Sequence, residues 1–228
     1  MLLDWILANK EILKIFYGLL ICFICALIVI KTDRLFKISD YQGLRYFRNS
    51  FFFYGVAFFT RFILGAIPTI KENSICFINV YFLFEFFMIV AGLFLLYSFI
   101  WKFIEKEKNH HSFFNVVATV FYVVAFLIAS LNFLLNTSIF MYLSQVILFL
   151  LMGLISYKNF KAGSDSYRFL KYYFIVIVLG LIAWILNASL EYFLEWNKIV
   201  QIGVYGLTGL FFVFFIYVIT KITGGRND

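Results

Sequence analysis

The chain has a single proline and only two histidines among its 228 residues. The histidines, His110 and His111, are adjacent in a charged segment, which excludes a serine–histidine protease, an H-E-x-x-H zinc site and bis-histidine haem ligation between helices. No aspartate lies within a long apolar run, so an intramembrane aspartyl dyad is excluded, and no glycine-rich phosphate loop is present. We therefore expect no catalytic residues, no metal site and no cofactor. The protein is predicted not to be an enzyme.

Charge is also scarce. Only 14% of the residues are charged, whereas 64% are hydrophobic, and the mean hydropathy is +0.96. Ordinary globular chains are about a quarter charged. A bilayer core takes about 20 apolar residues as a helix, and lipid offers the backbone no hydrogen-bond partners. The apolar runs lack the strict alternation of a membrane barrel, so an all-α membrane protein is predicted.

Seven apolar runs are long enough to span a bilayer and predict a seven-transmembrane-helix bundle. They are Ile12–Ile30, Phe47–Ile70, Ser74–Trp101, Phe113–Leu135, Ile139–Tyr157, Phe169–Leu190 and Ile199–Thr220. The runs define one transmembrane domain, residues 12–220. We expect residues 1–11 to lie along the outer interface and residues 221–228 to form a short cytoplasmic tail.

Lysine and arginine are distributed unevenly between the two sides of this bundle. One side carries Lys10, Lys14, Lys71 and Lys198. The other carries Lys31, Arg34, Lys37, Arg45, Arg48, Lys102, Lys106, Lys108, Lys158, Lys161, Arg168, Lys171, Lys221 and Arg226. Because the cytoplasmic side of a membrane protein is enriched in basic residues, the N-terminus is predicted outside and the C-terminus in the cytoplasm.

The net charge of +7 is therefore a topology signal. The basic residues are scattered over short loops, unlike a nucleic-acid footprint, so no nucleic-acid partner is expected. Each basic residue near an anionic membrane surface contributes about 1 kcal/mol of attraction. Besides the lipid bilayer itself, anionic lipids at the cytoplasmic face are the predicted partners.

Weak internal similarities suggest a 3+1+3 repeat, in which the first three helices recur as the last three. "ALIVIK" (26–31) resembles "GLISYK" (153–158), "VYFL" (80–83) resembles "VYGL" (204–207), and Gly55 and Gly180 lie at similar depths. Parallel repeats of this kind occur in transporters. A chance match between apolar segments is the alternative, and the residues alone leave both open.

Familiar seven-helix families do not match. Rhodopsins attach retinal to a lysine in the middle of the last helix, whereas Lys198 and Lys221 lie only at the ends of the corresponding run, so no retinal is expected. The SWEET and PQ-loop proteins share the three-one-three plan but rely on prolines within helices. The single proline here, Pro68, lies near the end of the second run, and no Pro-Gln pair occurs.

Two ionisable residues, Arg61 and Glu85, lie deep in the second and third runs. At 1.5 Å per residue, Arg61 is about 13 Å and Glu85 about 16 Å below the outer boundary. Lone charges at such depth are costly and generally pair or face a cavity. A buried ion pair between Arg61 and Glu85 is predicted, with a structural clamp and a functional site as the two open roles.

Further polar and aromatic residues are predicted to line a pocket that opens to the outside above this pair. They are Tyr54, Tyr81, Trp184, Asn187, Glu191, Gln201 and Tyr205. The alternative for the amide side chains is a position within two turns of the interface, where polar groups cost little.

These features predict a non-enzymatic, multi-pass protein of the cell membrane that resembles a sensor or receptor. It would recognise a small ligand or a membrane state from the outer half and signal to a separate cytoplasmic protein partner. The alternatives are a small-solute or proton-coupled transporter built from the 3+1+3 repeat, and a structural subunit of a membrane complex.

Overall fold

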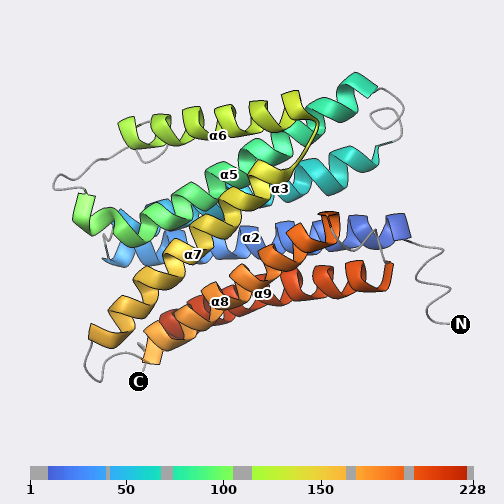
Figure 1. Ribbon diagram of the computed structural model, residues 1–228. Coiled ribbons are helices and arrows are strands. Elements are labelled where there is room, and N and C mark those ends of the chain that lie inside the picture. Colours follow the sequence, from blue (N-terminus) through green and yellow to red (C-terminus); the bar gives the residue numbers. More distant parts are fainter. Residues whose placement is uncertain are drawn as a thin grey trace, which may run out of the picture.

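The structure, a computed structural model, describes residues 10–39, 42–67, 74–104, 115–162, 168–192 and 198–224, and these are almost entirely helical. The α-helices are α2 (Lys10–Ser39), α3 (Gln42–Phe58), α5 (Ser74–Ile104), α6 (Val116–Leu135), α7 (Ile139–Ala162), α8 (Arg168–Tyr192) and α9 (Lys198–Gly224), as Figure 1 shows. A π-helix, η1 (Phe59–Ile63), and a 3₁₀-helix, η2 (Leu64–Ala66), continue α3. The prediction of an all-α chain is confirmed, and each of the seven apolar runs overlaps one of the seven α-helices among these described residues.

The two ends of the chain fall largely beyond this description. Of the segment predicted to lie along the outer interface, residues 1–9 lie outside the described residues, and residues 10 and 11 already belong to α2. Of the predicted tail, residues 225–228 are also outside it, whereas α9 continues to Gly224.

Within the part of the chain that the structure describes, four helices are long and apolar enough to cross a membrane. Their spans are Lys14–Lys37, Asn79–Trp101, Val116–Leu135 and Ile139–Lys158. Shorter apolar stretches, Phe174–Ser189 and Gly206–Tyr217, lie in α8 and α9. Length and composition thus support a membrane protein.

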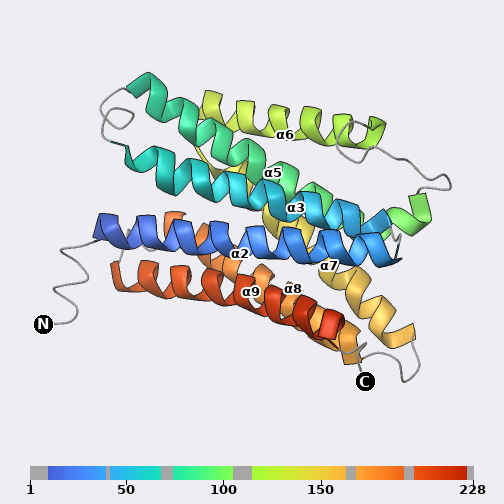
Figure 2. The same cartoon turned by 180° about the vertical axis from the view of Figure 1, so that it is seen from behind.

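Six of the helices form a closed ring. Going round it, α2 contacts α3, α3 contacts α5, α5 contacts α7, α7 contacts α8, α8 contacts α9, and α9 returns to α2. The seventh helix, α6, lies outside the ring against α5 and α7. Figures 1 and 2 show α6 at one edge of the bundle and α9 beside α2 at the opposite edge. The ring order follows the chain order, as expected when short connections join antiparallel neighbours.

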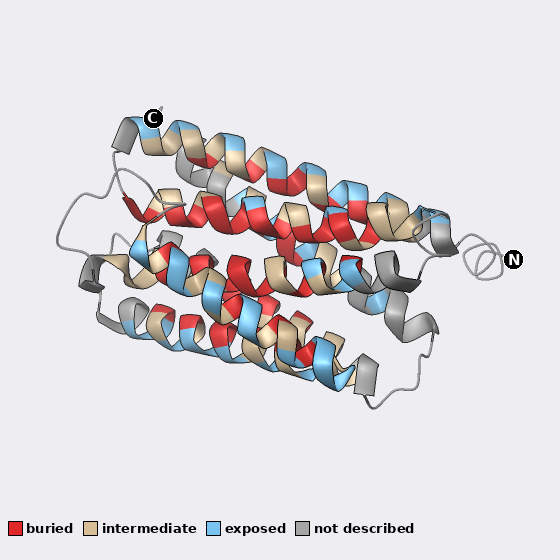
Figure 3. Cartoon of the chain, turned by 90° about the horizontal axis from the view of Figure 1, so that it is seen from above, coloured by how far each residue is buried: buried red, intermediate tan, exposed pale blue. Residues whose placement is uncertain are grey.

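Aromatic side chains fill the centre of this ring. Phe51 of α3 lies 4.9 Å from Phe215 of α9, measured between ring centroids, and Phe149 of α7 lies 5.7 Å from Phe211 of α9. All four rings are buried, and the pairs meet edge to face, the geometry that aromatic quadrupoles favour. Figure 3 shows buried residues on the inward faces of the helices and exposed residues on the outer faces. At mid-depth the ring is therefore closed by packing.

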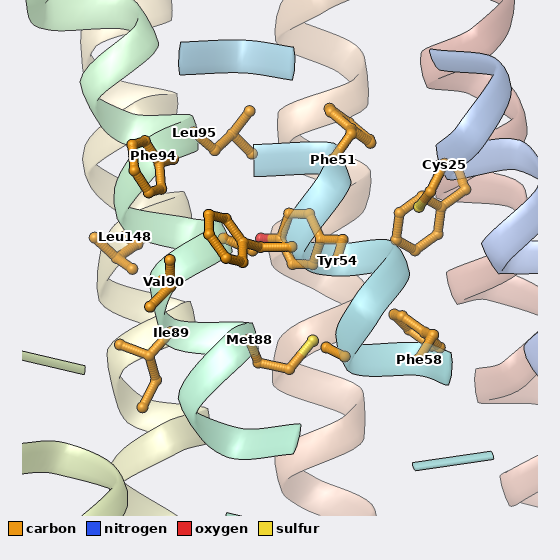
Figure 4. Close-up of a cluster of buried hydrophobic side chains, with 14 of the residues drawn as sticks. Cys25, Phe51, Tyr54, Phe58, Met88, Ile89, Val90, Phe94, Leu95 and Leu148 are labelled. Atoms are coloured by element: carbon orange, nitrogen blue, oxygen red, sulfur yellow. The ribbon is translucent and has the colours of Figure 1, made fainter. Parts of the chain in front are cut away.

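Three hydrogen bonds fix α3, α5 and α7 relative to one another. The Ser50 hydroxyl donates to the Ala91 carbonyl at 2.8 Å. The Gln145 side-chain amide donates to the Met88 carbonyl at 2.9 Å, and the Tyr54 hydroxyl donates to the Gln145 amide oxygen at 3.4 Å. Figure 4 shows Tyr54 surrounded by the apolar side chains of this region. Buried polar groups need such partners because an unpaired one costs about 1–3 kcal/mol.

Between the first two predicted runs, Ile12–Ile30 and Phe47–Ile70, α2 continues to Ser39 and α3 begins at Gln42. Asp33 explains the helical continuation. Its carboxylate forms an ion pair with Lys37, one turn further along α2, at 3.1 Å, and a second with Arg48 of α3. The carboxylate thereby links α2 to α3 where both emerge from their apolar stretches.

Gly180 of α8 packs directly against two phenylalanine side chains at the centre of the ring. A Cβ atom at this position would lie closer than 3.0 Å to the rings of Phe149 and Phe211, both of which are buried. We predict that Gly180→Ala destabilises the fold by about 1–3 kcal/mol, the usual cost of overpacking a core. The thermal unfolding midpoint in detergent measures this. Gly206→Ala is the matched control because a Cβ there meets nothing within 4 Å, and an equal loss in both variants would contradict the prediction.

Candidate functional site

Arg61 lies in the middle of the π-helix η1. The backbone N–H of Leu64 is shared between the carbonyls of Phe59 and Thr60, one bond of the π type and one of the α type. The sequence interpretation treated residues 47–70 as one regular helix, and this is corrected: the helix changes to π and then 3₁₀ geometry after Phe58. Single π turns inside α-helices are frequent at functional sites.

The Arg61 side chain points towards α5 and lies among aromatic rings. Its Cζ atom is 4.6 Å from the centroid of Phe84, 5.8 Å from Phe62 and 5.9 Å from Tyr81. Cations over ring faces at these distances are attracted by the ring quadrupole, more strongly where water is excluded. Arg61 itself is partly exposed, so it lies at the border of the packed core.

Glu85 is buried, with 6% of its surface exposed, and directly follows Phe84 on α5. The hydrogen bonds of Ser50 and Tyr54 set the register of α3 against α5 and α7, which places Arg61 beside the turn containing Tyr81 and Phe84. Glu85 therefore lies about one turn deeper than Tyr81. The guanidinium is brought next to the helical segment that carries Glu85, while the ion pair between them remains a prediction.

The exposed fraction of the side chains that point to the ring axis changes along the helices. On α5, Met88 is 1% exposed, whereas Tyr81, seven residues earlier on the same face, is 41% exposed. Tyr54 of α3 is buried, and Arg61 of η1, seven residues further along the chain, is partly exposed. Towards the inner end, by contrast, Leu95 of α5 is fully buried. Along this face the side chains are therefore more exposed at the end of the bundle that contains η1 than at mid-depth.

The remaining residues of the predicted outer pocket are distributed over both halves of the ring. Tyr54 lies at mid-depth, against Gln145 and Phe212. Trp184 packs on Tyr142, with ring centroids 6.1 Å apart. Asn187 donates to the Ala183 carbonyl at 2.8 Å and to the Thr208 hydroxyl at 3.3 Å.

The structure therefore brings Arg61 and Tyr81 together, and it brings Asn187 together with Thr208. Tyr54 lies about two turns deeper than Tyr81. The side chains of Glu191, Gln201 and Tyr205 lie outside the described residues, so their part in the pocket stays a prediction.

Two features of this site were missed from the sequence. Phe84 supplies the ring nearest to Arg61, and its position directly before Glu85 was the available signal. Gln145 of α7 belongs to the core, where its side-chain amide donates to the Met88 carbonyl. Among the described residues, no group of three or more His, Cys, Asp or Glu side chains is placed to hold a metal ion.

Comparisons with known proteins add little to this geometry. No known family matches the chain, and no solved structure matches it. A stretch of 99 residues is 30% identical to an uncharacterized protein of Archaeoglobus fulgidus. This match covers 40% of the chain and 44% of the archaeal protein, which is less than half of either.

The predicted pairing of Arg61 with Glu85 is tested by a double-mutant cycle. Removing one partner of a buried ion pair leaves the other charge stranded, typically at about 3–5 kcal/mol, and removing both can be nearly neutral. The cost in a membrane is expected at or below this range because water and snorkelling relieve part of it. We expect Arg61→Leu and Glu85→Leu each to lower the unfolding midpoint in detergent and the double variant to recover much of the loss.

Phe59→Leu serves as the control for that cycle, because Phe59 is an exposed residue of the same π-helix. It should leave the midpoint nearly unchanged. If the two single losses simply add, Arg61 and Glu85 do not interact.

Proposed function

We propose that the protein is a non-enzymatic sensor with seven membrane-spanning helices in the cell membrane, its N-terminus outside and its C-terminus in the cytoplasm. It recognises a stimulus from the outer half and acts on a separate cytoplasmic partner. The observation that carries this proposal is the position of Arg61. A permanently charged side chain lies in an irregular turn, at the depth where axis-facing residues become exposed. Ionisable residues within membrane helices generally serve a function.

The contacts of η1 supply a route from this site to the inner side. Tyr17 of α2 packs on Phe58 and Phe62, at 6.0 and 5.3 Å between ring centroids. Gly18 lets the backbone of α2 approach Phe62 so closely that a Cβ atom there would overlap it. From this contact α2 continues as a single helix to Asp33, which holds Arg48 of α3. A shift of η1 is therefore transmitted along α2 to the inner ion pair.

A transporter is the second candidate, and the ring arrangement favours it. The helices α2, α3 and α5 form one half of the ring and α7, α8 and α9 the other, with α6 outside as the connector, as a 3+1+3 repeat requires. Repeat-built transporters place the substrate between the halves. Here, however, Arg61 and Glu85 both belong to the first half, and aromatic rings fill the space between the halves. These positions support sensing over transport.

Anionic lipid at the cytoplasmic face remains part of the proposal. Arg34 and Lys37 are exposed on the inner end of α2, and the Lys37 side chain retains 74% of its exposure while paired with Asp33. Basic side chains so placed are available to lipid phosphates.

The proposed orientation predicts the outcome of reporter fusions. A reporter active only in the cytoplasm, fused after Asp228, is expected to be active, and one active only outside the membrane is expected to be silent. The reason is the excess of basic residues on the loops of the C-terminal side. The opposite pattern would invert the membrane orientation and contradict an outward-facing Arg61.

The proposed coupling predicts an effect at a distance. In lipid nanodiscs, Arg61→Leu is expected to change amide hydrogen exchange in peptides covering residues 31–48 severalfold, because local stability along α2 depends on its contact with η1. Phe59→Leu, in the same turn but exposed, should leave those peptides unchanged. Changes confined to residues 56–67 in the Arg61 variant would show that the site is a local clamp.

A further inference from the structure

The two halves of the ring, α2–α3–α5 and α7–α8–α9, meet at a contact that combines a glycine with a buried glutamine. We propose that the halves rotate against each other about this contact between Gly92 and Gln145, the pivot, and that the Tyr54 hydroxyl is a latch that holds them in the arrangement described above. The movement goes beyond the sensor function, because it requires neither a particular stimulus nor a particular orientation in the membrane.

The pivot lies where α5 and α7 approach each other closely. A Cβ atom on Gly92 would lie 2.8 Å from Cδ1 of Leu148 and 2.9 and 3.0 Å from the amide oxygen and nitrogen of Gln145. The Gln145 amide therefore packs directly on the backbone of α5. It also donates to the Met88 carbonyl at 2.9 Å, an ordinary hydrogen-bond length. Small residues allow membrane helices to approach in this way, and amide side chains at such interfaces bond across them.

A contact of this kind restrains translation more than rotation. Gln145 is fully buried, so sliding α7 along α5 would separate its amide from the Met88 carbonyl and leave a polar group in an apolar core, which is costly. Rotation about the same point keeps the bond, because one hydrogen bond is involved and Gly92 presents no side chain that Leu148 would have to pass. Domain movements generally use a few such positions as hinges.

Tyr54 of α3 reaches from the first half to two helices of the second. Its hydroxyl donates to the Gln145 amide oxygen at 3.4 Å, and its ring meets Phe212 of α9 edge to face at 6.0 Å between centroids. Figure 4 shows the hydroxyl pointing away from α3, towards the side where Leu148 lies. Bonds from a hydroxyl to an oxygen are ordinarily about 2.5–3.0 Å long, so the latch is weaker than the bond at the pivot.

Elsewhere the two halves meet through phenylalanine rings. Phe212 lies 5.5 Å from Phe58, and Phe215 lies 4.9 Å from Phe51, measured between centroids. Apolar contacts are non-directional, so these rings can shift against one another without leaving a polar group unpaired. Of the contacts named here, rotation about the pivot breaks one hydrogen bond, that of Tyr54.

Distances between pairs of spin labels measure the movement. Nitroxides are attached through p-acetylphenylalanine, which leaves the cysteines of the chain unchanged, and the full chain is studied in lipid nanodiscs by double electron–electron resonance. Labels at Phe23 of α2 and Ile182 of α8 report between the halves, and labels at Phe23 and Leu83 of α5 report within the first half. All three positions are exposed. For the wild type we expect a major and a minor distance between the halves and one distance within the first half.

Tyr54→Phe removes the latch and keeps the ring that packs on Phe212. We expect the ratio of the minor to the major distance to rise about threefold to tenfold, the range set by the net contribution of one hydrogen bond. Gln145→Leu removes both bonds and should raise the ratio at least as far. Tyr46→Phe is the matched control, because Tyr46 is equally buried on α3 but its hydroxyl accepts from Asn115, beside α6 and outside the ring. It should leave the ratio unchanged.

A single distance between the halves in the wild type would overturn the movement, whether or not the variants fold. An unchanged ratio in Tyr54→Phe would overturn the latch. An equal rise in Tyr46→Phe, or a second distance within the first half, would also contradict the proposal, because either would show a general loosening of the bundle.

Discussion

The packing of α3 against α5 is the contact on which the other features of this molecule depend. Ser50 and Ala91 join the two helices at one level, and Arg61 lies over Phe84 about three turns further out. Because both helices are rigid over this distance, the hydrogen bond at one end determines which α5 residues face the guanidinium at the other. Gln145 extends the same register to α7 through the Met88 carbonyl, and thereby joins the two halves of the ring.

The irregular turn at Phe59–Ala66 is compatible with a membrane because its polar groups have partners. The Thr60 hydroxyl donates to the Val56 carbonyl at 2.6 Å, and the Leu64 N–H reaches two carbonyls. Irregular backbone within a bilayer is tolerated only where it is buried in protein or lines a water-filled space. The turn packs against both α2 and α5, so its backbone faces protein on two sides. It is the one departure from α-geometry between Gln42 and Ala66, and it contains the charged residue Arg61.

The ring combines a symmetric outline with an asymmetric distribution of charge. Each half contributes three helices in the same order, yet Arg61, Glu85 and the π-helix all belong to the first half. The corresponding part of the second half presents Trp184 and Asn187, which are engaged with Tyr142 and Thr208. A transport pathway between equivalent halves would require recognition groups on both sides of the axis. This asymmetry is the reason for proposing a sensor, with the site in one half and α2 as the proposed route of coupling.

The amino-acid sequence by itself determined the helical class, the apolar centre of each helix and the two charges within apolar runs, because hydrocarbon imposes length and polarity on any segment that crosses it. Arg61 and Glu85 could be singled out for the same reason: charge within an apolar run is costly wherever the helix packs. Only the tertiary structure decided that Phe84 covers the guanidinium, that Gln145 belongs to the core, that the ring closes through α2 and α9, and that the helix changes to π geometry at Arg61. These features depend on which helices are neighbours in the bundle. Apolar side chains, such as the many phenylalanines, pack equally well against lipid and against protein. Their pattern along the chain therefore does not specify which helix each of them contacts.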